Sequence, residues 1–245
     1  MIGDLIRRAA DALRSARRIT VLTGAGISAE SGVPTFRGAE GLWRSFRAED
    51  LATPEAFARD PKLVWEWYDW RRGLIAKVRP NAGHVGLARW EARFPDFVLI
   101  TQNVDGLHPL AGSKAVLELH GDIWKTRCPA EGTVRENKDV PLPEIPPRCP
   151  ACGGLVRPHI VWFGEALDPA VIQAAYAASR ASDVMVVVGT SAIVYPAAAL
   201  PLAAAEGGAT IIEINPDPTP LSEQAHITLR GKAGEILPLI DQALD

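Results

Sequence analysis

The sequence has few of the features that mark secreted, membrane-spanning or nucleic-acid-binding proteins. Its 245 residues include only three cysteines, an odd number that argues against a disulfide framework and for a reducing compartment. The N-terminus has no apolar stretch typical of a signal peptide. The longest run of small apolar residues, 195–205, is interrupted by Pro196 and Pro201 and is too short to span a bilayer. These absences predict a cytoplasmic protein with no membrane partner.

An excess of either charge is also missing. The chain has 26 basic and 29 acidic residues, which gives a net charge of −3. Because no basic excess would attract a phosphate backbone, we expect no sequence-specific nucleic-acid partner. There is no internal repeat and no low-complexity segment, and the composition is 47% hydrophobic and 22% charged. Such a chain can bury one large core and a small subdomain.

Segments typical of strands and helices alternate along the chain. Apolar runs predict strands at 18–23, 97–101, 115–119, 184–188, 210–214 and 226–229. A helical pattern precedes the first strand. Asp168 and Pro169 are residue types that begin a helix, and 232–244 is typical of a closing helix despite Pro238. This alternation predicts an α/β fold with a doubly wound parallel sheet, in which ligands bind beyond the carboxyl ends of the strands.

Two stretches do not follow this alternation. Residues 39–90 are rich in aromatic residues and arginine, and their pattern indicates a helical insertion. Residues 123–157 contain six prolines and all three cysteines, so we expect them to be rich in loops.

The residues after the first strand match a dinucleotide-binding turn. Gly24, Gly26 and Ala29 occupy the positions where a tight turn, close approach to a pyrophosphate and close helix packing each require a small side chain. The helix that follows would direct its N-terminal amides at the anion. Small residues at such a turn also occur where they serve packing alone, so these positions by themselves leave both interpretations open.

Polar side chains follow two of the expected strands. Asn103 and Asp105 come after the second strand, and His120 comes after the third. Each has a structural alternative, the first two in an Asx turn and His120 as a hydrogen-bonded core residue. Because the carboxyl ends of parallel strands meet at one edge of a sheet, we expect all three beside Gly24, which favours a binding or catalytic site.

An ordered set of motifs carries a family resemblance. The motifs are GAGISAESGVPTFRG (24–38), TQNVDGLH (101–108), LHG (119–121), VWFGE (161–165), GTS (189–191) and EIN (213–215). With this set the chain resembles the sirtuins over roughly residues 15–240. The resemblance implies an NAD-consuming protein-lysine deacylase. It also implies a Rossmann-like domain made of 1–38, 91–122 and 158–245, and a small domain made of the insertions 39–90 and 123–157.

The resemblance implies where NAD binds. Gln102 and Asn215 would contact ribose hydroxyls, and Lys232 would lie near the adenine. Asp105 and the Val104 backbone would contact the nicotinamide carboxamide, and Phe36 would shield the ribose after nicotinamide leaves. The implied NAD-binding residues are Gly24, Ala25, Gly26, Ala29, Glu30, Thr35, Phe36, Arg37, Trp43, Gln102, Asn103, Val104, Asp105, Gly189, Thr190, Ser191, Asn215 and Ala233.

The same resemblance implies the chemistry. NAD would be a co-substrate whose bond between nicotinamide and ribose breaks while an acyl oxygen captures the ribose carbon. His120 would be the general base that takes a proton from a ribose hydroxyl, a task that suits an imidazole with a pKa near neutrality. Asn103 would be the second catalytic residue. The products would be free lysine, nicotinamide and O-acyl-ADP-ribose.

Protein substrates that carry acyl-lysine are the implied partners. Val161, Phe163, Gly164 and Glu165 would hold the peptide backbone together with the loop after Ser191, in a mode that adds a strand and reads little sequence. The alternative for this segment is a buried strand end.

The acyl preference has its own signal. Tyr68 and Arg71 are three residues apart and so share a helix face, and Ala52 is small. These residues resemble the Tyr-x-x-Arg pair and the small pocket residue of sirtuins that accept acidic acyl groups, which implies succinyl-lysine or malonyl-lysine ahead of acetyl-lysine. A guanidinium can pair with a distal carboxylate while a phenol donates a further hydrogen bond. The structural alternative is an exposed Arg71 and a half-packed Tyr68.

The metal-binding motif departs from the family pattern. Sirtuin zinc sites usually have two cysteine pairs, whereas here Cys149 and Cys152 form one pair and Cys128 is followed three positions later by Glu131. A carboxylate can bind zinc, although structural sites prefer cysteine and histidine, so both an occupied and an empty site remain open.

Two other functions use the same residues. One is an NAD or ADP-ribose sensor without turnover, for which the presence of His120 and Asn103 is unfavourable. The other is a mono-ADP-ribosyltransferase, for which the implied acyl pocket is unfavourable.

Overall fold

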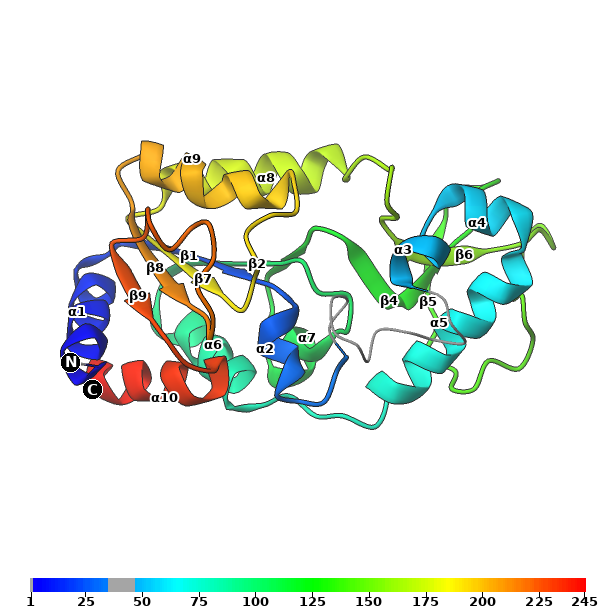
Figure 1. Cartoon of the computed structure of the whole chain (residues 1–245). Helices are drawn as coiled ribbons and strands as arrows, with labels where there is room; N and C mark the ends of the chain where they lie inside the picture. The colour runs from blue at the N-terminus through cyan, green and yellow to red at the C-terminus, as the bar shows by residue number, and fades with distance from the viewer. Residues whose placement is uncertain (1, 35–46) are drawn as a thin grey trace.

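A computed structural model describes residues 2–34 and 47–245 of the chain (Figure 1). Its larger part is built around a six-stranded sheet with the strand order β3-β2-β1-β7-β8-β9. The strands are β1 (Arg18–Thr23), β2 (Asp96–Thr101), β3 (Val116–Glu118), β7 (Val184–Val188), β8 (Thr210–Ile214) and β9 (Ile227–Leu229). All neighbouring pairs in this sheet are parallel.

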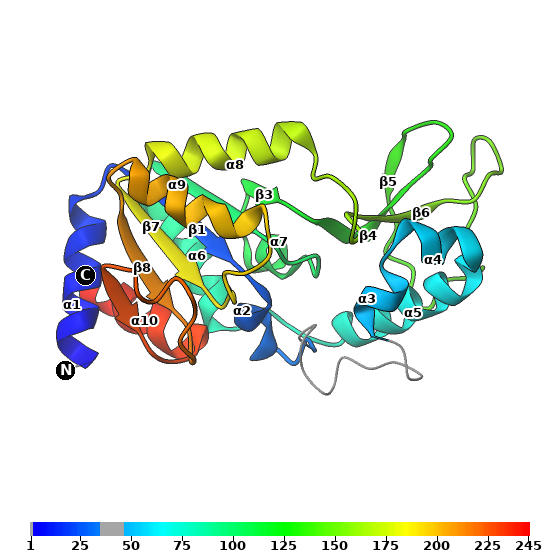
Figure 2. The same ribbon diagram turned by 45° about the horizontal axis from the view of Figure 1, so that its top comes forward.

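Helices cover both faces of the sheet. One face packs against α1 (Ile2–Ser15), α6 (Ala82–Arg93) and α10 (Ala233–Leu244), and the other against α8 (Pro169–Ala181) and α9 (Leu200–Glu206) (Figures 1 and 2). The side chains of β1 alternate between these layers: Val21 belongs to the first core cluster and Leu22 to the second. This is the two-residue period of a strand that is buried on both faces.

The strand order places a switch point beside β1. The chain moves outward from β1 to β2 and β3 on one side and continues from β7 to β9 on the other. Beyond the carboxyl ends of the strands at such a switch point, α/β folds commonly bind their ligands. The short helix α2 (Ala25–Ala29) begins directly after β1, and α7 (Leu107–Ala111) lies after β2.

The smaller part contains α3 (Ala48–Leu51), α4 (Pro54–Arg59), α5 (Pro61–Ile75) and an antiparallel sheet with the order β5-β4-β6. The strands of this sheet are β4 (Gly121–Arg127), β5 (Val134–Glu136) and β6 (Arg157–Ile160). Thr53 and Asp60 cap α4 and α5, and each helix begins with a proline, as expected from local preferences. The α/β fold with a smaller domain formed by a helical and a cysteine-containing insertion is thus confirmed.

Aromatic side chains dominate the core of the smaller domain. Trp65, Trp67 and Tyr68 of α5 are almost completely buried and share one cluster with Trp162 and with residues of β4 and β6. The two insertions therefore pack on each other rather than forming separate units. At the end of the first insertion, α6 instead packs in the sheet core through Leu87 and Trp90.

The structure also contains elements that the sequence patterns did not indicate. The stretch 123–157, expected to be loops, contributes most of the antiparallel sheet. Its strands are short, all three residues of β5 are exposed and prolines interrupt the region, so no two-residue period of hydrophobicity develops. No described helix is long and apolar enough to cross a membrane.

Candidate active site

A cavity of ≈ 670 Å³ lies between the carboxyl edge of the large sheet and the smaller domain. Cavities that bind small molecules have about this volume. It brings together most of the residues expected from the sequence to bind NAD or substrate. Those lining it are Gly24, Ala25, Gly26, Ala52, Tyr68, Arg71, Gln102, Asn103, Val104, His120, Val161, Phe163, Gly164, Glu165, Gly189, Thr190, Ser191 and Asn215.

The glycine turn after β1 packs against the loop after β7. The Gly26 N–H donates to the Gly189 carbonyl over 2.8 Å, and the Gly24 N–H donates to the Val188 carbonyl over 3.0 Å. A Cβ atom on Gly26 would lie only 2.7 Å from the Gly189 backbone. These glycines are therefore required by contact between the two loops at the switch point, in addition to any contact with a pyrophosphate.

Amide side chains connect the strand ends around this turn. The Asn103 Nδ2 atom donates to the Gly24 carbonyl over 3.0 Å and to Ser28 Oγ over 3.2 Å. Across the switch point, Gln102 Nε2 donates to Thr190 Oγ1 over 3.0 Å, and Asn215 Nδ2 donates to the Thr190 carbonyl over 2.8 Å. The ends of β1, β2, β7 and β8 are thus held together by side chains that also face the cavity.

His120 lies where the large sheet meets the smaller domain. Its Nδ1 atom is 2.9 Å from the Gln102 carbonyl oxygen. Because a carbonyl can only accept, Nδ1 carries the proton and Nε2 of the neutral ring has a free lone pair. Burial lowers the pKa of His120, although the hydrogen bond to Gln102 opposes this. The neutral form, which can accept a proton, is therefore favoured at neutral pH.

Several other expected NAD-binding residues do not line the cavity. Asp105 is buried and its Oδ1 atom accepts the Leu107 N–H over 2.9 Å, as in an Asx turn, while burial raises its pKa. Glu30 accepts the Gly234 N–H over 2.7 Å at the start of α10. Ala29 and Ala233 are not among the lining residues either. For all four, NAD contact remains a prediction, and Thr35, Phe36, Arg37 and Trp43 lie outside the described residues.

Tyr68 and Arg71 lie at the other end of the cavity. They are only 2% and 8% exposed, so the alternative of an exposed arginine and a half-packed tyrosine is wrong. The Arg71 guanidinium stacks at 5.3 Å from the Trp67 ring centroid. Burial raises the pKa of Tyr68 to about 12, so its hydroxyl keeps its proton at neutral pH. A buried cation and a buried hydroxyl donor therefore face the same space.

The segment Val161–Glu165 forms one wall beside this end. The Val161 N–H donates to the His120 carbonyl and the Phe163 N–H to the Ala52 carbonyl, each over 2.9 Å. Glu165 makes a bidentate salt bridge with Arg157, in which the two guanidinium nitrogens lie 2.6 and 2.7 Å from the two carboxylate oxygens. Phe163 is 49% exposed, which is consistent with a rim that a peptide can contact.

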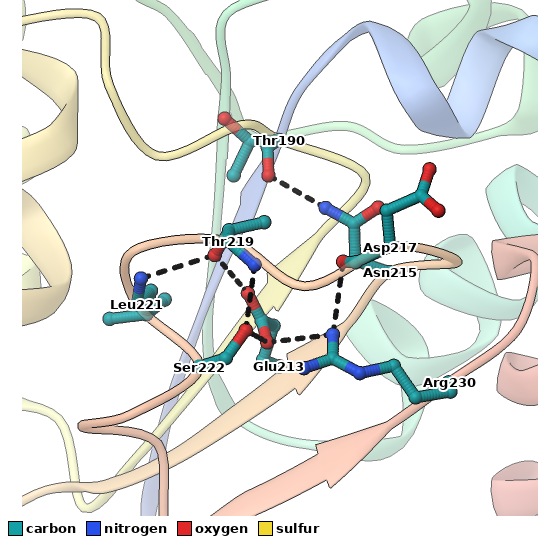
Figure 3. Close-up of polar contacts among 8 residues, drawn as sticks. All are labelled: Thr190, Glu213, Asn215, Asp217, Thr219, Leu221, Ser222 and Arg230. Atoms are coloured by element: carbon teal, nitrogen blue, oxygen red, sulfur yellow. Dashed lines mark hydrogen bonds and ion pairs between the residues drawn. The ribbon is translucent and has the colours of Figure 1, made fainter.

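A wall that the sequence motifs did not indicate closes the end beyond β8. The lining residues Asp217, Pro218, Thr219 and Pro220 belong to a loop that is held by Glu213, which is 1% exposed (Figure 3). The Glu213 carboxylate accepts hydrogen bonds from Thr219 Oγ1, from Ser222 Oγ over 2.6 Å and from Arg230 over 3.1 Å (Figure 3). Arg230 also donates to the Asp217 carbonyl over 3.0 Å. The signal in the sequence that could have indicated this loop was Glu213, a charged residue within the apolar strand β8.

The cysteines cluster away from the cavity. The ligand atoms of Cys128, Glu131, Cys149 and Cys152 all lie within 4.8 Å of one another. Tetrahedral zinc with about 2.3 Å bonds to sulfur and about 2.1 Å bonds to oxygen holds its ligand atoms roughly 3.6–3.8 Å apart. The Cys128–Cys152 sulfur distance is 3.6 Å, and Cys149 Sγ lies 3.7 Å from Glu131 Oε2. The four residues fit a zinc ion with three thiolates and one carboxylate.

Comparison with known proteins agrees with this architecture. The sequence profile of the Sir2 family matches residues 24–196. An Aquifex aeolicus protein named NAD-dependent protein deacylase is 60% identical over 215 residues, which cover 88% of this chain and 90% of the relative.

Two solved structures show what similar chains bind. A Sir2 homologue in complex with NAD superposes with a TM-score of 0.90 at 47% identity, covering 96% of this chain and 93% of the other. A Sir2 protein with a deacetylated p53 peptide and 3′-O-acetyl-ADP-ribose has a TM-score of 0.87 at 32% identity, covering 97% of each chain.

Proposed function

The chain belongs to the Sir2 family and is an NAD-dependent protein deacylase, and from that premise we propose that it prefers acyl groups with a distal carboxylate, succinyl and malonyl above acetyl. The observation that carries the proposal is the buried pair Tyr68 and Arg71 in the cavity that also contains His120.

The electrostatics of the pocket support this preference. Burial lowers the pKa of Arg71 because its charge is poorly solvated, while electrostatic interactions with Tyr68 and Asp105 oppose this shift. A carboxylate of the substrate that enters the cavity would add a further favourable charge contact. Hydrogen bonds to charged groups contribute about 1.5–3 kcal/mol each, which is roughly 10- to 150-fold in binding. An acetyl group has no distal oxygen and gains none of this.

Each of the remaining groups in the site has its own role in this proposal. NAD supplies the ADP-ribose that accepts the acyl group and one water is consumed, so the reaction releases nicotinamide, free lysine and O-acyl-ADP-ribose. His120 Nε2 takes the proton from the attacking ribose hydroxyl, and Asn103 acts beside it at the end of β2. Val161–Glu165 holds the peptide backbone of an acyl-lysine protein. Zinc held by the cysteine cluster would stabilise the fold of the smaller domain and takes no part in the chemistry.

The test compares acyl groups on one peptide. Arg71→Met keeps the length of the side chain but removes the charge and the donors. We expect the succinyl-to-acetyl ratio of kcat/KM to fall by about 100-fold, which corresponds to about 2.7 kcal/mol. Arg79→Met, at an exposed arginine just beyond the same helix, is the matched control and should leave the ratio unchanged. Equal losses for the succinyl and acetyl peptides would contradict the proposal.

Intact-mass analysis of the peptide also checks the reaction class. Loss of the acyl mass is expected. A gain of the mass of ADP-ribose would instead indicate an ADP-ribosyltransferase.

A further inference from the structure

We propose that Trp162 is a specificity-determining residue of this enzyme: its indole N–H fixes the Tyr68 hydroxyl as a donor toward the cavity, where it selects acyl groups that carry an acceptor at their far end. This inference rests on the proposed preference for acidic acyl groups and adds the residue that orients one of the two recognition groups.

The first observation is a hydrogen bond between the helical insertion and the segment that follows the cysteine-containing insertion. Trp162 Nε1 lies 2.9 Å from Tyr68 Oη, and both side chains are only 2% exposed. An indole nitrogen can only donate, so the phenol oxygen is the acceptor in this contact. Because the indole hydrogen occupies one side of that oxygen, the hydrogen of the hydroxyl has to point to another side.

The second observation is that this hydrogen has no protein acceptor in the described part of the chain. Among the described residues, Tyr68 Oη makes one hydrogen bond, the one that it accepts from Trp162 Nε1. The hydroxyl remains protonated at neutral pH, as its raised pKa indicates, and Tyr68 borders the cavity. A buried O–H group without an acceptor is unfavourable, and a ligand that supplies one relieves this. A carboxylate oxygen is a strong acceptor, whereas the methyl group of an acetyl is not an acceptor.

The third observation explains why the indole cannot turn away. The Arg157 guanidinium lies 3.5 Å from the Trp162 ring centroid and is itself held by Glu165 and, over 2.9 Å, by the Ile160 carbonyl. Glu165 also accepts the Trp162 backbone N–H over 2.9 Å. Both the backbone and the ring of Trp162 thus contact one partly buried ion pair, and supporting contacts of this kind keep a donor in a fixed direction.

The chain offers a matched control for this hydrogen bond. Trp65 is 1% exposed and its ring packs edge-on against Tyr68, with centroids 6.3 Å apart. Its Nε1 atom, however, donates to the Val156 carbonyl over 2.9 Å and not to the phenol. Trp65→Phe and Trp162→Phe therefore remove the same group from the same core, and only the second leaves the Tyr68 hydroxyl without its donor.

The experiment measures kcat/KM for a succinyl and an acetyl form of one peptide. We expect Trp162→Phe to lower the succinyl-to-acetyl ratio about three- to tenfold, which is the size of effect expected when one ordinary hydrogen bond is lost. Trp65→Phe should lower the melting temperature and leave the ratio unchanged. In a Tyr68→Phe background, Trp162→Phe should have no further effect on the ratio, because the hydroxyl on which it acts is already absent.

A second measurement does not depend on the folding of the Trp162 variant. Both the wild type and the Tyr68→Phe variant are labelled with ¹⁵N-tryptophan, and one indole N–H resonance should differ in chemical shift between them. In the wild type, the same resonance should respond more to a succinyl peptide than to an acetyl peptide. No shift of any indole resonance in Tyr68→Phe would overturn the inference.

The outcomes separate this inference from the proposal beneath it. If Arg71→Met lowers the succinyl-to-acetyl ratio but Trp162→Phe lowers it equally with and without the Tyr68 hydroxyl, the role of Trp162 is wrong and the acyl preference stands. If Arg71→Met leaves the ratio unchanged, the acyl preference itself is wrong.

Discussion

The two ends of the cavity are built in different ways. The end at the sheet is made by backbone: Gly24, Gly26 and Gly189 bring two loops so close that a Cβ atom would clash with the opposite chain. The end in the smaller domain is made by side chains, with Tyr68 and Arg71 presented from α5. Backbone geometry is suited to a partner that never changes, such as NAD. A few side chains on a separate domain can determine which acyl group is preferred without disturbing the NAD-binding end.

Charge is also handled differently at the two ends. Beyond β8, the buried Glu213 has its partners within the protein, and the network of Figure 3 uses it to hold a loop in place. In the smaller domain, Arg71 is buried with its cationic group beside the cavity. Glu213 does not itself line the cavity, as is typical of a structural charge, whereas Arg71 lines it, as a group that receives a ligand does.

The largest expected effect lies where the two ends meet. His120→Ala should lower kcat by about 10³-fold, since a general base contributes about 10²–10⁴. It should do so equally for succinyl and acetyl peptides, because the ribose proton is common to both. Mass spectrometry of peptide turnover gives the rate, and calorimetry should show that most NAD binding remains. Unchanged turnover would remove His120 from this role.

The pH dependence follows from the same residue. Burial lowers the pKa of His120, so the active neutral ring persists to lower pH than a free imidazole would allow. In a measurement of kcat against pH, the apparent pKa of the acid limb should therefore lie below the ordinary histidine pKa of about 6.5.

The next effect concerns the smaller domain alone. Cys149→Ser should lower bound zinc from about one equivalent to well below half in protein purified without chelator, and lower the melting temperature by about 5 °C or more. Because the four cluster residues do not line the cavity, the Kd for NAD should change little. Less than about a tenth of an equivalent of zinc in the wild type would contradict zinc binding.

The smallest effect should appear at the loop beyond β8. Glu213→Gln removes the charge that organises Thr219, Ser222 and Arg230, and we expect the KM for NAD to rise about three- to tenfold, the loss of about 1 kcal/mol of hydrogen bonding. The succinyl-to-acetyl ratio should stay constant. Glu223→Gln, at an exposed glutamate in the same region, is the control. A changed acyl ratio would show that the two ends are coupled.

Local patterns were reliable for strands that are buried along almost their whole length. The strands at 18–23, 184–188 and 210–214 have the boundaries that their apolar runs predict. The antiparallel sheet was missed because its strands are short and partly exposed and therefore have no continuous run of apolar residues. The domain boundaries, the roles of individual site residues, a cytoplasmic location and the absence of a nucleic-acid partner remain predictions.

The sequence by itself determined the fold class, the family and most of the residues that surround the cavity, because glycine turns and residues at strand ends are set by local backbone chemistry. Only the tertiary structure decided how those residues are tuned. It gave His120 its tautomer through the Gln102 carbonyl, buried Tyr68 and Arg71, and brought Trp162 to the Tyr68 hydroxyl. Burial and hydrogen-bond direction depend on groups far apart in the chain, and no local pattern encodes them.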